Sequence, residues 1–217
     1  MRTFGFPEFL FILEAAKWTL ALSAIAFVGG AILGLAIALM RTSESTWARG
    51  ISTTFIQIFQ GTPLLLQLFL VFFCAPVLGL DINPWVAAGV ALILNSAAFL
   101  GEIWRGCIEA IPRGQWEAAE ALSLKYTSRM RDVVLPQAFK IALAPTVGYV
   151  VQIIKGTSLA AIIGFVEVTR AGQIVNNATF QPLIVFSVVA AIYFVICWPL
   201  SLLAARMERK RARALAR

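Results

Sequence analysis

The sequence lacks histidine altogether, and only 13% of its 217 residues are charged. Histidine is the most common general base and a frequent metal ligand near neutral pH, so its absence argues against a membrane enzyme or a metal transporter. A soluble domain usually has about a quarter of its residues charged, whereas 60% of this chain is hydrophobic. Much of its surface must therefore face lipid, and we expect one membrane-embedded, all-α domain over residues 1–217.

Cysteine is scarce as well, and no nucleotide-binding motif is present. Cys74, Cys107 and Cys197 are widely separated and match neither a metal site nor a disulfide framework. The phosphate loop G-x-x-x-x-G-K-[ST] is absent, because in Lys155-Gly156-Thr157-Ser158 the lysine precedes the glycine and lies in an apolar stretch. We therefore expect no metal or cofactor in this chain, and any ATP and Mg²⁺ to be bound by a separate ATPase chain.

Apolar stretches long enough to cross a bilayer, about 20 residues each, occur five times. They cover residues 18–40, 55–78, 83–104, 136–165 and 182–205. Gly61-Thr62-Pro63 interrupts the second, and Asn83-Pro84 is a typical helix start for the third. The first is too long for a cleavable signal peptide, and residues 4–13, too short to cross, are expected at the interface. The predicted fold is a polytopic membrane protein with five transmembrane helices.

Lysine and arginine are distributed unevenly between the two sides of these spans. Fourteen of the eighteen basic residues lie between the first and second spans, between the third and fourth, or after the fifth. Only Arg2, Lys17 and Arg170 lie on the other side, and Lys155 is within a span. Basic residues favour the cytoplasmic side, so we expect the N-terminus outside and the C-terminus in the cytoplasm. Next to apolar spans they suit lipid phosphates, so the net charge of +7 does not indicate nucleic-acid binding.

The cytoplasmic loop over residues 105–138 is long and amphipathic. Its apolar residues at helical spacing are Trp116, Ala119 and Leu122, followed by Met130, Val133 and Val134. This spacing predicts two short helices joined near residues 123–125. Their apolar faces must be buried against the ends of the spans or against a cytoplasmic partner.

The same loop carries the string Glu117-Ala118-Ala119, then Ser123, then Val133 and Leu135-Pro136. This pattern resembles the EAA signature of ABC importer permeases, in which glycine stands at the position of Ser123. Other strings are similar to the polar amino acid permeases of that family. They are Phe59-Gln60-Gly61-Thr62-Pro63, Asn95-Ser96-Ala97-Ala98-Phe99, Gly101-Glu102-Ile103-Trp104-Arg105, Ile111-Pro112-Arg113-Gly114-Gln115-Trp116, Leu135-Pro136-Gln137-Ala138 and Lys155-Gly156-Thr157-Ser158.

The resemblance implies a coupling role for this loop. The first helix would seat on a cytoplasmic ATPase, with Glu117 capping or orienting it and Ala118 and Ala119 permitting close approach. Ser123, Leu135 and Pro136 would complete the coupling motif. A non-glycine residue in a left-handed turn costs on the order of 1 kcal/mol, so we expect the turn at Ser123 to survive, slightly strained.

The family also implies a set of partners and a location. These are a second permease subunit (identical or not), two cytoplasmic ATPases, an external substrate-binding protein, an amino acid substrate and the bacterial inner membrane.

Polar residues inside spans are costly and usually face protein or water, so they are candidates for a substrate pathway. The candidates are Gln60, Gln67, Asn95, Glu102, Lys155, Thr157 and Ser158. Breaks near Pro63 and Gly156 favour this interpretation, because broken helices often line transport sites. Each residue could instead satisfy a neighbouring helix, and Glu102 could pair with Arg105 or Lys155.

Two further sets of residues suggest contacts. Candidates for an external gate or a binding-protein contact are Glu167, Arg170, Asn176 and Asn177. A ridge of small residues in the first span consists of Ala26, Gly30, Gly34 and Ala38. Such ridges let helices approach closely. Packing within the subunit is the preferred use of the ridge, and a dimer contact is the alternative.

The expected function is that of a permease subunit working by alternating access in an ATP-driven, binding-protein-dependent importer. Five helices are too few to enclose a hydrophilic route, so a dimer is expected. The alternatives are a self-sufficient secondary transporter or channel, which would usually show internal repeats, a membrane enzyme, or a permease for another small polar solute.

Overall fold

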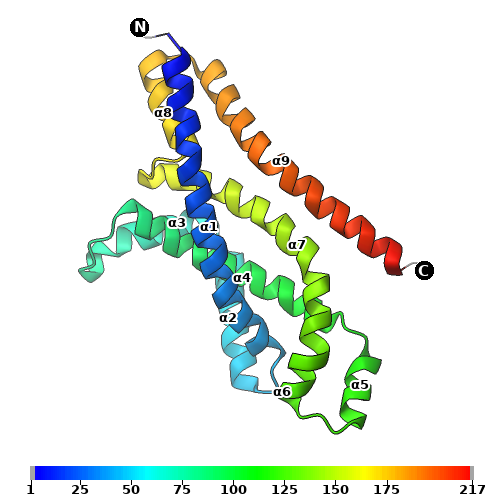
Figure 1. Ribbon diagram of the computed structural model, residues 1–217. Helices are drawn as coiled ribbons and strands as arrows, with labels where there is room; N and C mark the ends of the chain where they lie inside the picture. The colour runs from blue at the N-terminus through cyan, green and yellow to red at the C-terminus, as the bar shows by residue number, and fades with distance from the viewer. Residues whose placement is uncertain (1–2, 216–217) are drawn as a thin grey trace.

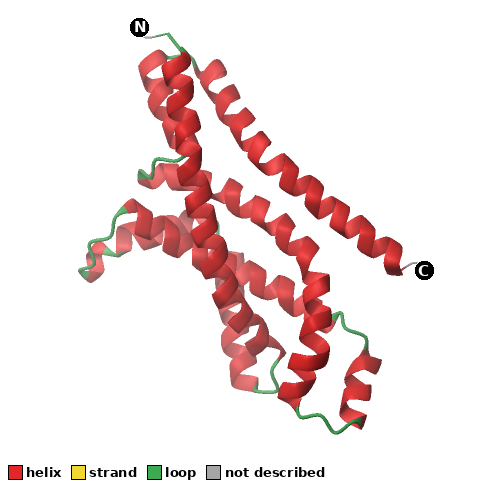
Figure 2. Ribbon diagram, viewed as in Figure 1, coloured by secondary structure: helices red, strands yellow, loops and turns green. Residues whose placement is uncertain are grey.

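The computed structural model describes residues 3–215, and every regular element in that range is helical (Figures 1 and 2). Arg2 and Arg217, which were counted among the basic residues that predict the orientation in the membrane, lie outside the described residues. The elements are α1 (Phe6–Thr42), α2 (Thr46–Gly61), α3 (Leu64–Cys74), η1 (Pro76–Leu78), α4 (Pro84–Glu109), α5 (Arg113–Ala121), α6 (Tyr126–Ser128), η2 (Arg129–Val134), α7 (Leu135–Gly156), η3 (Thr157–Ile163), α8 (Val168–Thr179) and α9 (Pro182–Leu215).

Within the described residues, four helical segments are long and apolar enough to cross a membrane. They are Phe6–Thr42, Pro84–Glu109, Tyr126–Ile163 and Pro182–Arg213. A fifth is formed if the bent pair Thr46–Gly61 and Leu64–Leu78 counts as one span. The predicted all-helical membrane fold is therefore confirmed.

The second span breaks at the interruption that the sequence indicated, but it turns by 101° there. Pro63 has no backbone N–H and disfavours a helical conformation at the residue before it. Thr62 is accordingly extended, with φ −117° and ψ 141°. The helix also begins nine residues earlier than predicted, at Thr46, where the Ser45 side chain accepts a hydrogen bond from the Ala48 N–H.

Residues 6–13 are continuous with the first span, because α1 is one helix of 37 residues. The interfacial location expected for residues 4–13 stays a prediction. The residues that join the two halves, Glu14-Ala15-Ala16-Lys17, are good helix formers, and Glu14 forms an ion pair with Lys17 one turn later. A helix of this length is about 55 Å long and therefore extends well beyond a hydrocarbon core of about 30 Å.

The small-residue ridge of α1 packs against α4 within the same subunit. Ala26, Gly30, Gly34 and Ala38 are all buried. A Cβ added at Gly30 would lie 2.5 Å from the Ser96 Cβ, which is closer than atoms pack. The preferred use of the ridge, packing inside the subunit, is therefore the one that the fold adopts, and it places α1 along the length of α4 (Figure 1).

The second loop helix was predicted as a separate element, and this was wrong. Residues 126–163 form one helical segment, so Met130, Val133 and Val134 belong to the same segment as the fourth span. A wider π-helical turn, η2, precedes Pro136. Proline cannot donate the usual backbone hydrogen bond, and a wider turn accommodates the missing donor without ending the helix.

The sequence analysis also missed α8 and ended α9 too early. The amphipathic helix α8 lies beside the N-terminal part of α1 and the start of α9 (Figure 1). The helix α9 continues about ten residues beyond the predicted end at Ala205. Arginine and lysine are good helix formers and are favoured near a helix C-terminus, so a basic tail prolongs the helix instead of ending it.

Candidate coupling surface and transport pathway

The helix α5 is held against the long α6–α7 segment by its inner face. Ala119 is buried, and Trp116 packs on a cluster that includes Met130, Val134 and Ile108. Two polar contacts cross the same seam: Arg129 pairs with Glu120 at 3.6 Å, and the Gln137 side chain donates to the Gln115 Oε1 at 3.2 Å. The apolar spacing in the sequence therefore marked Trp116 and Ala119 correctly as the inner face of α5, but it was wrong for Leu122, which is 75% exposed.

The turn after α5 forms with Ser123 in the left-handed region, at φ 56°. The Ser123 N–H donates to the Glu120 carbonyl at 2.8 Å, and the Leu124 N–H donates to the Ala119 carbonyl at 3.2 Å. This pair of bonds is the Schellman arrangement, which usually has glycine at the position of Ser123. The strained turn expected from the sequence is thus present.

Replacing Ser123 by glycine is expected to stabilise this turn by about 1 kcal/mol, because glycine reaches positive φ without steric cost. The melting temperature of the purified protein in detergent should rise by roughly 2–4 °C. Ser123→Ala serves as the control, because it also removes the hydroxyl but keeps the Cβ and should give no gain. A lower melting temperature for Ser123→Gly than for Ser123→Ala would contradict the argument from strain.

The outer face of α5 makes no polar contact with the rest of the described chain. Glu117 and Ala118 are exposed, and no hydrogen bond or ion pair engages the Glu117 side chain. The expectation that Glu117 caps the helix was wrong, because α5 begins at Arg113 after Pro112 and Glu117 lies in its second turn. Leu122, at the end of the helix, is 75% exposed.

The base of the loop is tied to the neighbouring spans. The Tyr126 hydroxyl donates to the Thr42 carbonyl at the end of α1, at 3.0 Å. Leu135 packs on the apolar cluster beneath α5, while Pro136 is exposed on α7. A displacement of α5 would therefore be transmitted to α7 and to the end of α1. No pattern in the sequence had marked Tyr126 for this contact.

The break between α2 and α3 is filled by a buried polar network. The Gln67 side-chain N–H₂ donates to the Phe59 carbonyl at 2.8 Å and to the Thr62 carbonyl at 3.0 Å. The Asn95 side chain on α4 donates to the Gln67 Oε1 at 3.0 Å. Both side chains are buried, so these two predicted pathway residues satisfy backbone groups that the break releases.

Glu102 and Arg105 form an ion pair within α4, and Arg105 also contacts Glu109. The Arg105 Nε donates to the Glu102 Oε2 at 2.9 Å. Of the two partners considered for Glu102, the structure therefore selects Arg105 and not Lys155.

The remaining pathway candidates do not gather at one point. Gln60 and Lys155 are exposed, whereas Thr157 is buried and donates to the Ile154 carbonyl at 2.7 Å. Ser158 donates to the Lys155 carbonyl at 2.7 Å. One subunit thus presents exposed polar groups at the break in α2 and near the end of α7, and it does not assemble a closed site from them.

Among the outer candidates, Glu167 is fully buried and caps α8. Its carboxylate accepts the Thr169 and Arg170 backbone N–H groups at 2.9 and 2.8 Å, and the Tyr193 hydroxyl of α9 donates to it at 2.6 Å. Burial raises the pKa of the Glu167 carboxyl above its usual value, although these hydrogen bonds oppose the shift. The residue that the sequence offered as a gate is therefore part of the packing between α8 and α9.

The other outer candidates lie along α8 itself. Arg170 is half-buried and donates to the Gln173 side chain at 3.1 Å, Asn177 is exposed, and the Asn176 Oδ1 is buried without a partner. The fold is that of a multi-pass membrane protein in which the outer face of α5 is left uncovered.

Comparison with known proteins identifies the family. A family model described as the binding-protein-dependent transport system inner membrane component matches residues 19–213. The chain belongs to this family of multi-pass transport-system membrane components. In such systems ATP is hydrolysed by a separate chain.

Relatives and solved structures cover nearly the whole chain. It is 33% identical over 205 residues to the probable amino-acid ABC transporter permease protein YckA of Bacillus subtilis, covering 94% of this chain and 91% of that protein. It is 35% identical over 206 residues to the glutamine transport system permease protein GlnP of Escherichia coli, covering 94% of each.

Among solved structures, a chain of an amino acid ABC transporter crystallised with histidines matches with a TM-score of 0.88 at 32% identity, covering 96% of this chain and 100% of that one. A chain of the inward-facing MetNI methionine transporter, at 18% identity and a TM-score of 0.79, shares the fold.

Proposed function

We propose that this chain imports amino acids as one of two permease subunits, driven by two cytoplasmic ATPases and supplied by an external binding protein. The observation that carries the proposal is α5. It is a short helix whose inner face is fixed to α7 and whose outer face, with Glu117, Ala118 and Leu122, is left uncovered. A rigid, exposed helix that is mechanically tied to the spans is what a separate motor needs in order to move them.

The amino acid substrate is supported by the relatives named for amino acid, glutamine and L-cystine transport. It is also supported by the amino acid transporter structure that aligns over almost the whole chain. We infer that Gln60, Lys155 and Ser158 face the pathway once two subunits meet, since Gln60 and Lys155 are exposed and Ser158 is half-buried. A second subunit is required because these groups do not close a site within one subunit.

The proposed orientation has the N-terminus outside and the C-terminus in the cytoplasm. It rests on the excess of lysine and arginine around α5 and along the end of α9. The external side then carries α8, where Arg170, Asn176 and Asn177 are the candidates for contact with the binding protein. Alternating access follows if ATP-driven closure of the two ATPases pushes both α5 helices together.

The test is reconstitution with partners encoded beside the gene. The tagged chain should co-purify with an ATPase, and proteoliposomes should take up radiolabelled glutamine or cystine only with internal ATP and external binding protein. The control is the same preparation with ATP replaced by a non-hydrolysable analogue. Uptake driven by an ion gradient alone, or the absence of any associated ATPase, would contradict the proposal.

A further inference from the structure

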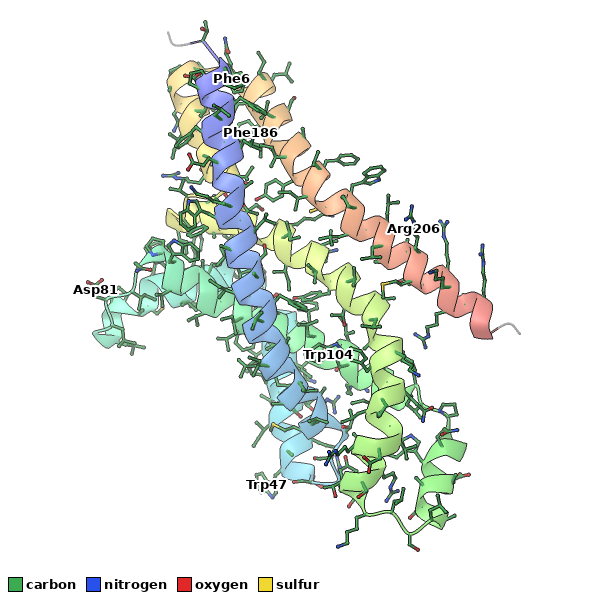
Figure 3. The ribbon with its side chains drawn as sticks, viewed as in Figure 1. Phe6, Trp47, Asp81, Trp104, Phe186 and Arg206 are labelled. Atoms are coloured by element: carbon green, nitrogen blue, oxygen red, sulfur yellow. The ribbon has the colours of Figure 1, made fainter. Side chains whose placement is uncertain are left out.

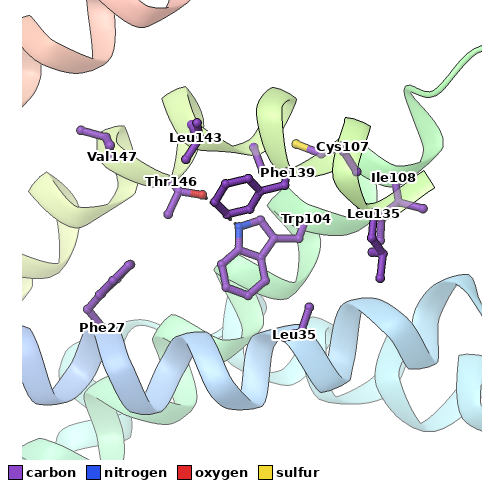
Figure 4. A pocket seen from close by; sticks show the side chains of 12 residues that line it. Phe27, Leu35, Trp104, Cys107, Ile108, Leu135, Phe139, Leu143, Thr146 and Val147 are labelled. Atoms are coloured by element: carbon purple, nitrogen blue, oxygen red, sulfur yellow. Dashed lines mark hydrogen bonds between the residues drawn. The ribbon is translucent and has the colours of Figure 1, made fainter. Parts of the chain in front are cut away.

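A groove with a volume of about 570 Å³ lies between α1, α4 and α7 (Figure 4). Its walls are apolar: Phe27 and Leu35 come from α1, Trp104 from α4, and Phe139 and Leu143 from α7. The volume falls within the range of about 300–1,000 Å³ that is usual for ligand sites. The groove is therefore large enough for a ligand and offers it a hydrocarbon surface.

The few polar atoms in the groove are already engaged with each other. The Trp104 Nε1–H donates to the Thr146 Oγ1 at 2.9 Å, which is the bond drawn in Figure 4. Apart from the Thr146 hydroxyl and the weak Cys107 thiol, these side chains offer a polar solute no free donor, so it would lose most of its hydration. A hydrocarbon chain has no such cost, so the lining favours an acyl chain.

Two basic residues neighbour residues that line this groove. Lys140 is exposed and follows Phe139, which is itself 66% exposed. From α9, Arg211 lies close enough to act electrostatically on the thiol of Cys107, another residue that lines the groove. Neither Lys140 nor Arg211 forms an ion pair within the part of the chain that the structure describes.

The rest of the α9 end strengthens this charge. Arg206, Arg209 and Lys210 are also exposed and have no acidic partner among residues 3–215. Figure 3 shows Arg206 on the same stretch of helix. The exposed acid Glu208 lies on the same stretch of α9. The basic rim of the groove therefore consists of Lys140 and Arg211, and an anion that carries hydrocarbon chains complements both the rim and the apolar lining.

We propose that this groove binds one anionic phospholipid, with an acyl chain along Trp104, Phe139 and Leu143 and its phosphate between Lys140 and Arg211. A zwitterionic lipid could fill the groove but would bring an ammonium group to the basic rim. A helix of a second subunit would bury part of this unpaired charge, which is costly without an acidic partner. The inference goes beyond the proposed function, since it does not depend on which solute is carried.

The experiment measures lipid retention by the full-length chain in complex with its ATPase, using native mass spectrometry. The probes are phosphatidylglycerol and phosphatidylcholine with identical acyl chains, titrated onto the delipidated complex. The unaltered complex should retain one phosphatidylglycerol per permease subunit more tightly than phosphatidylcholine. The double variant Lys140→Gln/Arg211→Gln should weaken phosphatidylglycerol retention by about thirtyfold and leave phosphatidylcholine unchanged.

The matched charge control is Lys17→Gln/Arg170→Gln, which removes two cations outside both the groove and α5 and should retain phosphatidylglycerol normally. The apolar part is tested by Leu143→Trp, which fills the groove and should reduce retention of both lipids. Its control is Leu20→Trp, at an exposed leucine of α1 outside the groove. Thermal melting of each complex verifies that the variants are folded.

Three results would overturn the proposal. Equal retention of the two lipids by the unaltered complex would remove the role of the basic rim. Equal loss in the charge variant and its control would show that net charge, not this site, attracts the lipid. Normal retention by a folded Leu143→Trp variant would show that the acyl chain does not lie in the groove.

Discussion

Replacing Glu117 by lysine is expected to abolish ATP-driven uptake while leaving the chain folded. Glu117 is exposed on the outer face of α5 and contacts no other side chain of the described structure, so its loss removes nothing from the fold. If an ATPase docks on this face, the lysine at position 117 would lie against groups of the ATPase that are arranged to bind a carboxylate. Such a mismatch costs several kcal/mol, and a cost of about 2 kcal/mol already weakens docking roughly thirtyfold.

The measurement pairs uptake with assembly. Proteoliposomes with Glu117→Lys should show near-background uptake, and the ATPase should dissociate more readily during purification. Glu44→Lys is the matched control, because Glu44 is an exposed acid in the turn between α1 and α2, outside α5. Normal uptake by Glu117→Lys would refute the coupling role of this face, whereas equal loss in both variants would mean that charge reversal anywhere on that side is harmful.

Replacing Gln67 by leucine is expected to destabilise the chain by about 2 kcal/mol or more. The change keeps the side-chain volume but leaves the Thr62 carbonyl without a donor. It leaves the Phe59 carbonyl with only a long contact of 3.5 Å from the Asn95 amide, and it removes the closer acceptor of that amide. Buried polar groups that lose a partner cost about 1–3 kcal/mol each, and no water is available inside a bilayer to replace it.

The melting temperature of the purified Gln67→Leu protein should therefore fall by roughly 4–8 °C. The control is Gln60→Leu, the same substitution on the α2 side of the same break. Gln60 is exposed and makes a single contact, donating to the Ala98 carbonyl at 3.3 Å. A similar fall for both variants would show that the network around Gln67 does not hold the break together.

The membrane fold was predictable because a bilayer allows few solutions. Lipid cannot satisfy backbone polar groups, so apolar stretches of about 20 residues must be helices. The break at Pro63 was also predictable from the sequence, because proline disrupts a helix locally whatever packs around it.

Helix ends were harder to predict. The sequence between Leu13 and Trp18 contains no breaker, and the basic tail after Ala205 is helix-forming, so α1 and α9 both run further than the apolar residues alone suggest.

The candidate pathway was the least predictable part. Gln67, Asn95 and Glu167 have the polarity expected of ligand-facing groups, yet each is buried and satisfies backbone or neighbouring side chains. A polar residue in a span signals that it needs a partner, but not whether that partner is protein or substrate. Tyr193 was missed because a tyrosine in an apolar span gives no sign of a carboxylate 26 residues away.

The sequence by itself determined the apolar spans, the break at Gly61-Thr62-Pro63 and the buried position of Ala119 on α5, because each follows from local composition and spacing. Only the tertiary structure decided which polar groups remain free. Many hydrogen bonds depend on which helices pack together, so Gln67 closes a break next to Asn95 of α4, while Glu117 and Lys155 are left exposed for other partners.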